Sequence, residues 1–228
     1  MTVTPPHNHI PFRNISKGTS INGYVDALIS FLENYLPSFP TERKVFMDMN
    51  ENDITELLYK HLTRKAKFNA EGKEYPFVFQ PEKSQKKKEE KGHPKRVDIA
   101  GRINTLDIDM EVIYCLEAKK LPTDKVGGKR EKEYVLGNGG AIERFKNEAH
   151  GLDDAGNLLS RNGIVAYVTA NDFNTWQSKI NAWMNELKWH KSELPKLEYA
   201  TAIGKLKSKH FRVSGEPFEL NHFWVGVS

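Results

Sequence analysis

The sequence predicts an α/β domain in which helices flank a mixed β-sheet. Apolar residues recur at helical spacing in several segments of the chain, and three short β-rich segments follow one another between residues 75 and 121. A further segment, 162–171, is almost wholly apolar, which is typical of a central strand covered on both faces. Helices and strands in this order form a layered α/β core.

The N-terminal part predicts an irregular arm followed by two helices. Residues 1–20 contain three prolines and little periodicity, so they are expected to be the arm. The segment 23–36 places apolar side chains on one helical face. A second helix is expected to begin near Glu51, with Asn50 or Asn52 as its N-cap.

The rest of the chain predicts an antiparallel meander of three strands, followed by alternating helices and strands. The meander strands are expected at 75–80, at 95–101 and within 103–121. The later helices are expected at 131–149, with a Gly-rich interruption at 137–140, and at 172–187, with one or two strands beyond residue 197. We expect a single domain over 21–228, with its core at about 50–190 and its C-terminal strands at 197–228.

Composition excludes several classes of protein. No apolar run approaches the roughly 20 residues that a membrane span needs. The first residues have no apolar h-region, so a secretory signal is not expected. The one cysteine, Cys115, rules out an intrachain disulfide and suits a reducing cytoplasm. Its apolar surroundings predict a packed core thiol.

The basic stretch from Glu82 to Arg96 carries seven Lys or Arg against three Glu, within a chain of net charge +4. Two interpretations stay open, a solvated loop and a loop that contacts phosphates. The residues expected to bind nucleic acid are Lys86, Lys87, Lys88, Arg96 and Lys120.

The candidate catalytic residues lie in the segments VDI (97–99) and LEAKK (116–120). Because side chains alternate along a strand, Asp98 faces away from its apolar neighbours, and Glu117 shares a face with Lys119. If the two strands are neighbours, Asp98 and Glu117 converge. Their carboxylates, with the backbone carbonyl of Ala118, suit Mg²⁺, which prefers hard oxygen ligands and keeps several waters.

Such a constellation suits phosphodiester hydrolysis. The metal neutralises the phosphate and lowers the pKa of a bound water. Lys119 can orient or deprotonate that water, or stabilise charge in the transition state. Two neighbouring carboxylates are expected to keep Lys119 protonated until a metal binds, and bound Mg²⁺ is then expected to lower its pKa.

Asp98, a gap of eighteen residues and then Glu117-Ala118-Lys119 resembles the PD-(D/E)XK nuclease superfamily. The resemblance implies a restriction-endonuclease-like αβββαβ core with Asp98, Glu117 and Lys119 as catalytic residues. Many members also have a glutamate on the helix before the first core strand. Glu51 is our first choice for that residue, as a further catalytic residue and metal ligand, and Glu56 is the second. Val97 stands where the family often has proline.

The resemblance implies a Mg²⁺-dependent endonuclease, with Mn²⁺ as a substitute ion. Similarity to bacterial restriction and defence nucleases favours double-stranded DNA as the substrate, and a homodimer or a subunit of a defence complex as the assembly. Two alternatives stay open: a nucleic-acid-binding or scaffolding protein with this fold and little activity, and a member that cuts RNA.

Other motifs are expected to be structural, although a backbone approach to nucleic acid at 137–140 and a phosphate contact by His210 stay open. The GNGG segment (137–140) lacks the GK[ST] of a P-loop, and GxSxG is absent from the sequence. His210 and His222 lie in strand-like segments, where core packing or hydrogen bonding is the expected role.

Overall fold

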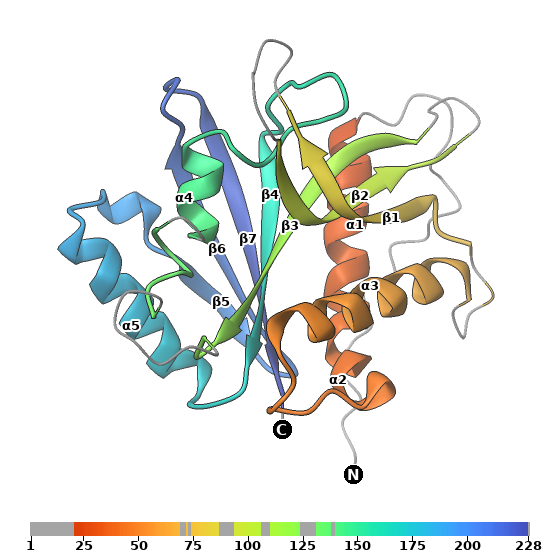
Figure 1. Ribbon diagram of the computed structural model, residues 1–228, viewed down its shortest axis with the longest axis horizontal. Helices are drawn as coiled ribbons and strands as arrows, with labels where there is room; N and C mark the ends of the chain where they lie inside the picture. The colour runs from red at the N-terminus through yellow and green to blue at the C-terminus, as the bar shows by residue number, and fades with distance from the viewer. Residues whose placement is uncertain are drawn as a thin grey trace.

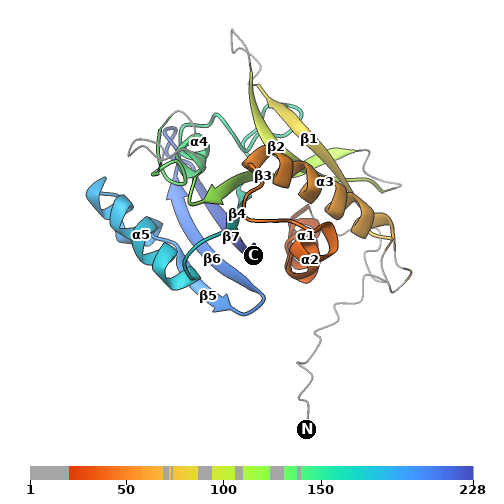
Figure 2. The ribbon, with the colours of Figure 1, turned by 60° about the horizontal axis from the view of Figure 1, so that its bottom comes forward.

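A seven-stranded mixed β-sheet forms the centre of the molecule. The computed structural model describes residues 21–68, 72, 74–86, 94–105, 110–123, 131–137 and 140–227. The strand order is β1-β2-β3-β4-β7-β6-β5. Figures 1 and 2 show α1, α2 and α3 on one face of this sheet and α4 and α5 on the other. The expected α/β class, with helices flanking a mixed sheet, is confirmed.

The strands run in both directions. They are β1 (Phe77–Gln85), β2 (Lys95–Ile103), β3 (Glu111–Leu121), β4 (Arg161–Val168), β5 (Lys196–Ala200), β6 (Ile203–Phe211) and β7 (Pro217–Gly226). The first three form the expected antiparallel meander. Strands β3, β4 and β7 are mutually parallel and central, and β6 and β5 continue antiparallel from β7. The central position of β4 explains its almost wholly apolar sequence.

The helices are amphipathic and cover the two faces of the sheet. They are α1 (Ile21–Tyr35), α2 (Phe39–Arg43), α3 (Glu51–Lys67), α4 (Ala141–Lys146) and α5 (Phe173–Glu186), with short 3₁₀ turns at Leu36–Ser38 and Lys191–Glu193. Helix α3 begins after Asn50, whose side chain accepts a hydrogen bond from the Asp53 N–H. No helix in the described ranges is long and apolar enough to cross a membrane.

Two apolar clusters fill the layers on either side of the sheet. Leu116 and Ala118 of β3 face the cluster under α1 and α3, and Cys115 faces the cluster under α4 and α5. This alternation confirms the phase predicted for β3. Cys115 is completely buried, as expected for a core thiol.

Three local expectations differ from the structure. The basic stretch 82–96 begins and ends within strands, since Ser84 pairs with Arg96 in the β1–β2 ladder. Of the helix expected over 131–149 only α4 forms; it begins at the expected Gly-rich interruption, at Gly140, where a Cβ would lie 2.5 Å from the Leu136 carbonyl carbon. Three strands follow residue 195 rather than one or two. The arm at 1–20 lies outside the described residues.

Candidate active site

The candidate site lies at a fork where β2 and β3 stop pairing, beyond the Ile99–Leu116 pair. From that point the edge of β3 that faced β2 needs new partners for its backbone N–H groups. Two acidic side chains supply them. Asp98 Oδ2 accepts from the Ala118 N–H at 2.6 Å, and Glu51 Oε2 accepts from the Lys120 N–H at 2.7 Å. The fork therefore draws carboxylates from β2 and α3 to one stretch of β3.

Asp98 and Glu117 are brought together where the β2–β3 ladder ends. The last pair is Ile99–Leu116, and Asp98, the adjacent residue of β2, accepts from the N–H of Ala118, the neighbour of Glu117 in β3. Asp98 also lines one end of a cleft of about 490 Å³ between α3 and the β1–β2 hairpin. Burial, and then repulsion from Glu117, raises the pKa of Asp98 to about 7.

Glu117 is completely buried and surrounded by cationic or nitrogen-bearing side chains. Its Oε1 lies 2.5 Å from Arg144 Nη1 and 3.2 Å from Lys119 Nζ, and its Oε2 lies 3.0 Å from His150 Nδ1. Burial alone would raise the pKa of this carboxyl. Lys119, His150 and Arg144 outweigh burial and lower the pKa to about 2. Glu117 is therefore ionised at neutral pH.

Lys119 lies between two carboxylates. Its ammonium is 3.2 Å from Glu117 Oε1 and 3.2 Å from Glu51 Oε1. Burial disfavours the charged form, but attraction to Glu117, Glu51 and Asp98 is stronger and raises the pKa of the ammonium. This direction agrees with the expectation that neighbouring carboxylates favour the protonated form of Lys119.

The structure distinguishes the two candidate glutamates of α3. Glu51, the first residue of α3, reaches both the Lys119 ammonium and the Lys120 N–H. Glu56 is exposed and pairs with Lys60 one turn along the helix, although both residues line the same cleft as Asp98. The carboxylate that joins the fork is that of Glu51.

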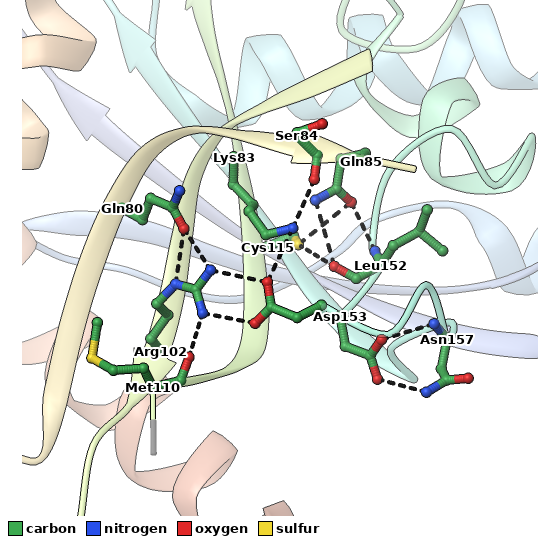
Figure 3. A network of polar contacts seen from close by, with 11 residues as sticks. Gln80, Lys83, Ser84, Gln85, Arg102, Met110, Cys115, Leu152, Asp153 and Asn157 are labelled. Atoms are coloured by element: carbon green, nitrogen blue, oxygen red, sulfur yellow. Dashed lines mark hydrogen bonds and ion pairs between the residues drawn. The ribbon is translucent and has the colours of Figure 1, made fainter. Parts of the chain in front are cut away.

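Two residues of the site, Arg144 and His150, were not predicted from the sequence. Both come from α4 and the turn that follows it, and both contact Glu117. Figure 3 shows how the next segment is held: the Leu152 N–H donates to Gln85 Oε1 at 2.8 Å. Arg102 also forms two contacts with Asp154, at 2.7 and 3.0 Å. No sequence spacing relates this turn to β3, because the tertiary fold alone brings them together.

The residues expected to bind nucleic acid differ in their settings. Lys86 is exposed, whereas Lys87 and Lys88 lie outside the described residues. Arg96 is exposed and pairs with Glu82 at 2.8 Å. Lys120 is 6% exposed, and its ammonium donates to the Met49 carbonyl at 2.8 Å. Lys120 thus ties β3 to the loop before α3, and a contact with nucleic acid would require it to leave that position.

The donor atoms at the fork are of the kind that Mg²⁺ prefers. Asp98 and Glu117 supply carboxylates, and the Ala118 carbonyl leaves β3 on the same side as its N–H, toward Asp98. Within the described ranges, no group of three or more His, Cys, Asp or Glu side chains is gathered closely enough to hold a metal. Since Mg²⁺ binds through one or two carboxylates and keeps its waters, Asp98, Glu117 and the Ala118 carbonyl fit it without Glu51.

Comparisons with known proteins add no assignment: no family model matches the chain, and neither a curated protein nor a solved structure matches it.

Proposed function

We propose that the protein is a Mg²⁺-dependent endonuclease of the PD-(D/E)XK type. The observation that carries the proposal is the fork, where Asp98 accepts from the N–H next to Glu117 and Lys119 lies between Glu117 and Glu51. A buried, ionised carboxylate beside a carboxyl of raised pKa is typical of a functional site. Burying two groups that repel each other lowers the stability of the fold, and proteins accept that cost mainly where the groups bind a ligand.

The order of elements supports the same proposal. Helix α3, strands β1, β2 and β3, helix α4 and strand β4 follow one another, with β3 antiparallel to β2 and parallel to β4. This order agrees with the αβββαβ core that the sequence resemblance implies. The same resemblance leads us to propose double-stranded DNA as the substrate and restriction or anti-phage defence as the context.

The proposed reaction divides the work among a few residues. Asp98, Glu117 and the Ala118 carbonyl would hold Mg²⁺, with Mn²⁺ as a substitute, and the bound ion supplies Lewis acidity and an activated water. Lys119 presents a protonated ammonium to the same space, where it stabilises negative charge on the attacked phosphate. Glu51 orients this ammonium and holds the Lys120 N–H, so it positions β3 from the opposite helical layer.

The test is cleavage of plasmid DNA, single-stranded DNA and RNA, each with Mg²⁺, Mn²⁺ or EDTA. Wild-type protein should cut plasmid DNA with either ion and not in EDTA. Glu51→Gln should reduce the rate, and Glu56→Gln is its matched control because Glu56 lies on the same helix and lines the same cleft. Absence of metal-dependent cleavage of all three substrates would overturn the proposal.

A second candidate function is nucleic-acid binding without cleavage. It is favoured by Lys119 and Arg144, which already neutralise Glu117. Binding to DNA without turnover in any divalent ion would support it. Substituting Lys86, Lys87 and Lys88 with glutamine should then weaken binding and flatten its dependence on salt. Each phosphate contact that is lost lowers the number of counterions released when the protein binds.

A further inference from the structure

We propose that His150 is a positioning residue that fixes the rotation of the Glu117 carboxylate by holding its Oε2 atom. The inference rests on the proposed function, in which Glu117 binds the metal. His150 belongs to the turn after α4 and lies 33 positions from Glu117 in the sequence, so no short motif includes both.

His150 Nδ1 and Glu117 Oε2 are two buried polar atoms that lie next to each other. His150 is completely buried, as is Glu117. In the part of the chain that the structure describes, both ring nitrogens of His150 and the Oε2 of Glu117 lack a hydrogen-bond partner. Yet His150 Nδ1 lies 3.0 Å from this same oxygen. This distance suits a hydrogen bond, but the imidazole ring is not aligned for one. A small rotation of the ring would let Nδ1–H donate to Oε2, which satisfies both atoms.

The two carboxylate oxygens of Glu117 face different partners. Oε1 of Glu117 faces Lys119 and Arg144, at 3.2 and 2.5 Å. Oε2 faces His150. Arg144 has a side chain that is 27% exposed, and His150 has one that is 1% exposed. Oε1 therefore lies toward the open side of the site, and His150 supports the carboxylate from behind.

The turn that carries His150 is held by several backbone contacts. The His150 N–H donates to the Arg144 carbonyl at 3.2 Å, which closes the end of α4. Gly151 follows with φ of +85°, and a Cβ there would lie 3.0 Å from the Asn162 side chain. Leu152 is then bound to Gln85 of β1 (Figure 3). The backbone that carries the imidazole is thus held on both sides by hydrogen bonds, as a positioning group requires.

The experiment compares three substitutions of His150. Asparagine places an amide N–H where Nδ1 lies, glutamine places it where Nε2 lies, and leucine offers none. Mn²⁺ affinity is measured by EPR titration, which needs no turnover, and thermal unfolding in EDTA checks the fold. His150→Asn should stay within about threefold of wild type, and His150→Gln and His150→Leu should lose about 10- to 100-fold, the usual cost of removing a partner of a metal ligand.

The controls separate this inference from the proposed function. Glu117→Gln should abolish Mn²⁺ binding, and His190→Leu, at an exposed histidine remote in sequence, should leave it unchanged. If wild type binds Mn²⁺ and all three His150 variants bind it equally well, the inference fails and the proposed metal site stands. If wild type does not bind Mn²⁺, both fail. Equal losses in the asparagine and glutamine variants with unaltered unfolding would also overturn the hydrogen-bonding role of Nδ1.

Discussion

Two buried polar clusters in this protein are built from similar residues and have opposite characters. The fork cluster contains Glu117, His150 and Lys119. The second, which we call the relay, joins β6 and β7 to the segments that pack over them. Its members are Trp224, Tyr134, His222, Ser208, His210 and Glu193. Both clusters combine histidine with a carboxylate.

The relay is a continuous chain of hydrogen bonds with a single direction. Trp224 Nε1 can only donate, and it donates to the Tyr134 hydroxyl at 2.9 Å. The hydroxyl then donates to His222 Nδ1, whose Nε2 donates to Ser208, and Ser208 donates to His210 Nε2, each at 2.7 Å. Burial lowers the pKa of both histidines, so neutral rings and one tautomer each complete the chain.

The relay ends at an anion that its neighbours stabilise. His210 Nδ1 lies 3.2 Å from Glu193 Oε1, and Lys146 pairs with the same oxygen. Burial opposes ionisation of Glu193, but these two partners lower its pKa to about 2. Ser208, His210 and Glu193 have the spacing of a hydrolase triad. Ser208 is only 3% exposed and His210 only 1%, so no substrate reaches them and the triad-like geometry is structural.

The difference teaches how to separate structural from functional polar clusters. In the relay each side chain donates or accepts along one path, as buried networks that stabilise a fold do. In the fork, buried atoms of Glu117 and His150 lack hydrogen bonds, and two cations crowd one carboxylate oxygen. The fork therefore lacks the single path of donors and acceptors that the relay has, which agrees with the metal-binding role proposed for Glu117.

The largest expected effect is on cleavage. Lys119→Ala should reduce the single-turnover rate by roughly 10²- to 10⁴-fold while largely sparing DNA binding, because its charge acts mainly in the transition state. Asp98→Ala should be worse, since it removes a metal ligand. Lys60→Ala is the matched control, because Lys60 lines the cleft but pairs with Glu56 outside the fork. Wild-type rates in Lys119→Ala would remove this lysine from the mechanism.

The next effect is on stability and concerns the relay. Ser208→Ala removes the hydroxyl that links the two histidines, so His222 Nε2–H loses its acceptor and His210 Nε2 its donor. We expect a loss of about 2–3 kcal/mol in the free energy of unfolding, measured by urea denaturation. Mn²⁺ affinity should not change, which separates the two clusters. A neutral substitution would show that the relay does not stabilise the fold.

Sequence reasoning recovered the parts of the site that depend on local periodicity. Alternation along β3 gave the shared face of Glu117 and Lys119, and the spacing of two strands gave Asp98. From the sequence, Glu51 could be chosen only by its position in α3. The structure supports that choice, because Glu51 contacts the Lys119 ammonium and the Lys120 N–H. Arg144 and His150 were missed because a turn with two positive-φ residues brings them to Glu117, and no residue pattern in one sequence marks that turn.

The length of the β1–β2 hairpin and the C-terminal topology were also beyond the sequence. A run of lysines suggested a loop, whereas the ladder that continues to Gln85 and Lys95 is set by pairing between the two strands. Insertion of β7 between β4 and β6 joins segments about 50 residues apart, and strand order of this kind follows from packing across the whole sheet.

The smallest expected effect is a gain in stability at the fork. Asp98 has its pKa raised to about 7 from 3.8 when unfolded. Between these values the unfolded chain releases a proton that the folded protein keeps, so the stability from this group is complete below pH 3.8 and is lost as pH rises through 7. An asparagine at this position cannot ionise and keeps an oxygen for the Ala118 N–H. Asp98→Asn should therefore stabilise the protein in EDTA at pH 8 by about 1–2 kcal/mol, less than the full shift implies because the side chain is partly exposed.

The pH dependence of that gain tests its cause. It should vanish near pH 4, and Mg²⁺ should reverse it at pH 8 by binding the wild-type carboxylate. Asp154→Asn is the control of opposite sign: Arg102 and Lys83 lower the pKa of Asp154 against the effect of burial, so its loss should destabilise the protein at pH 8. Urea denaturation of the three proteins at both pH values makes the comparison. An Asp98→Asn variant no more stable than wild type at pH 8 would show that the fork carries no electrostatic strain.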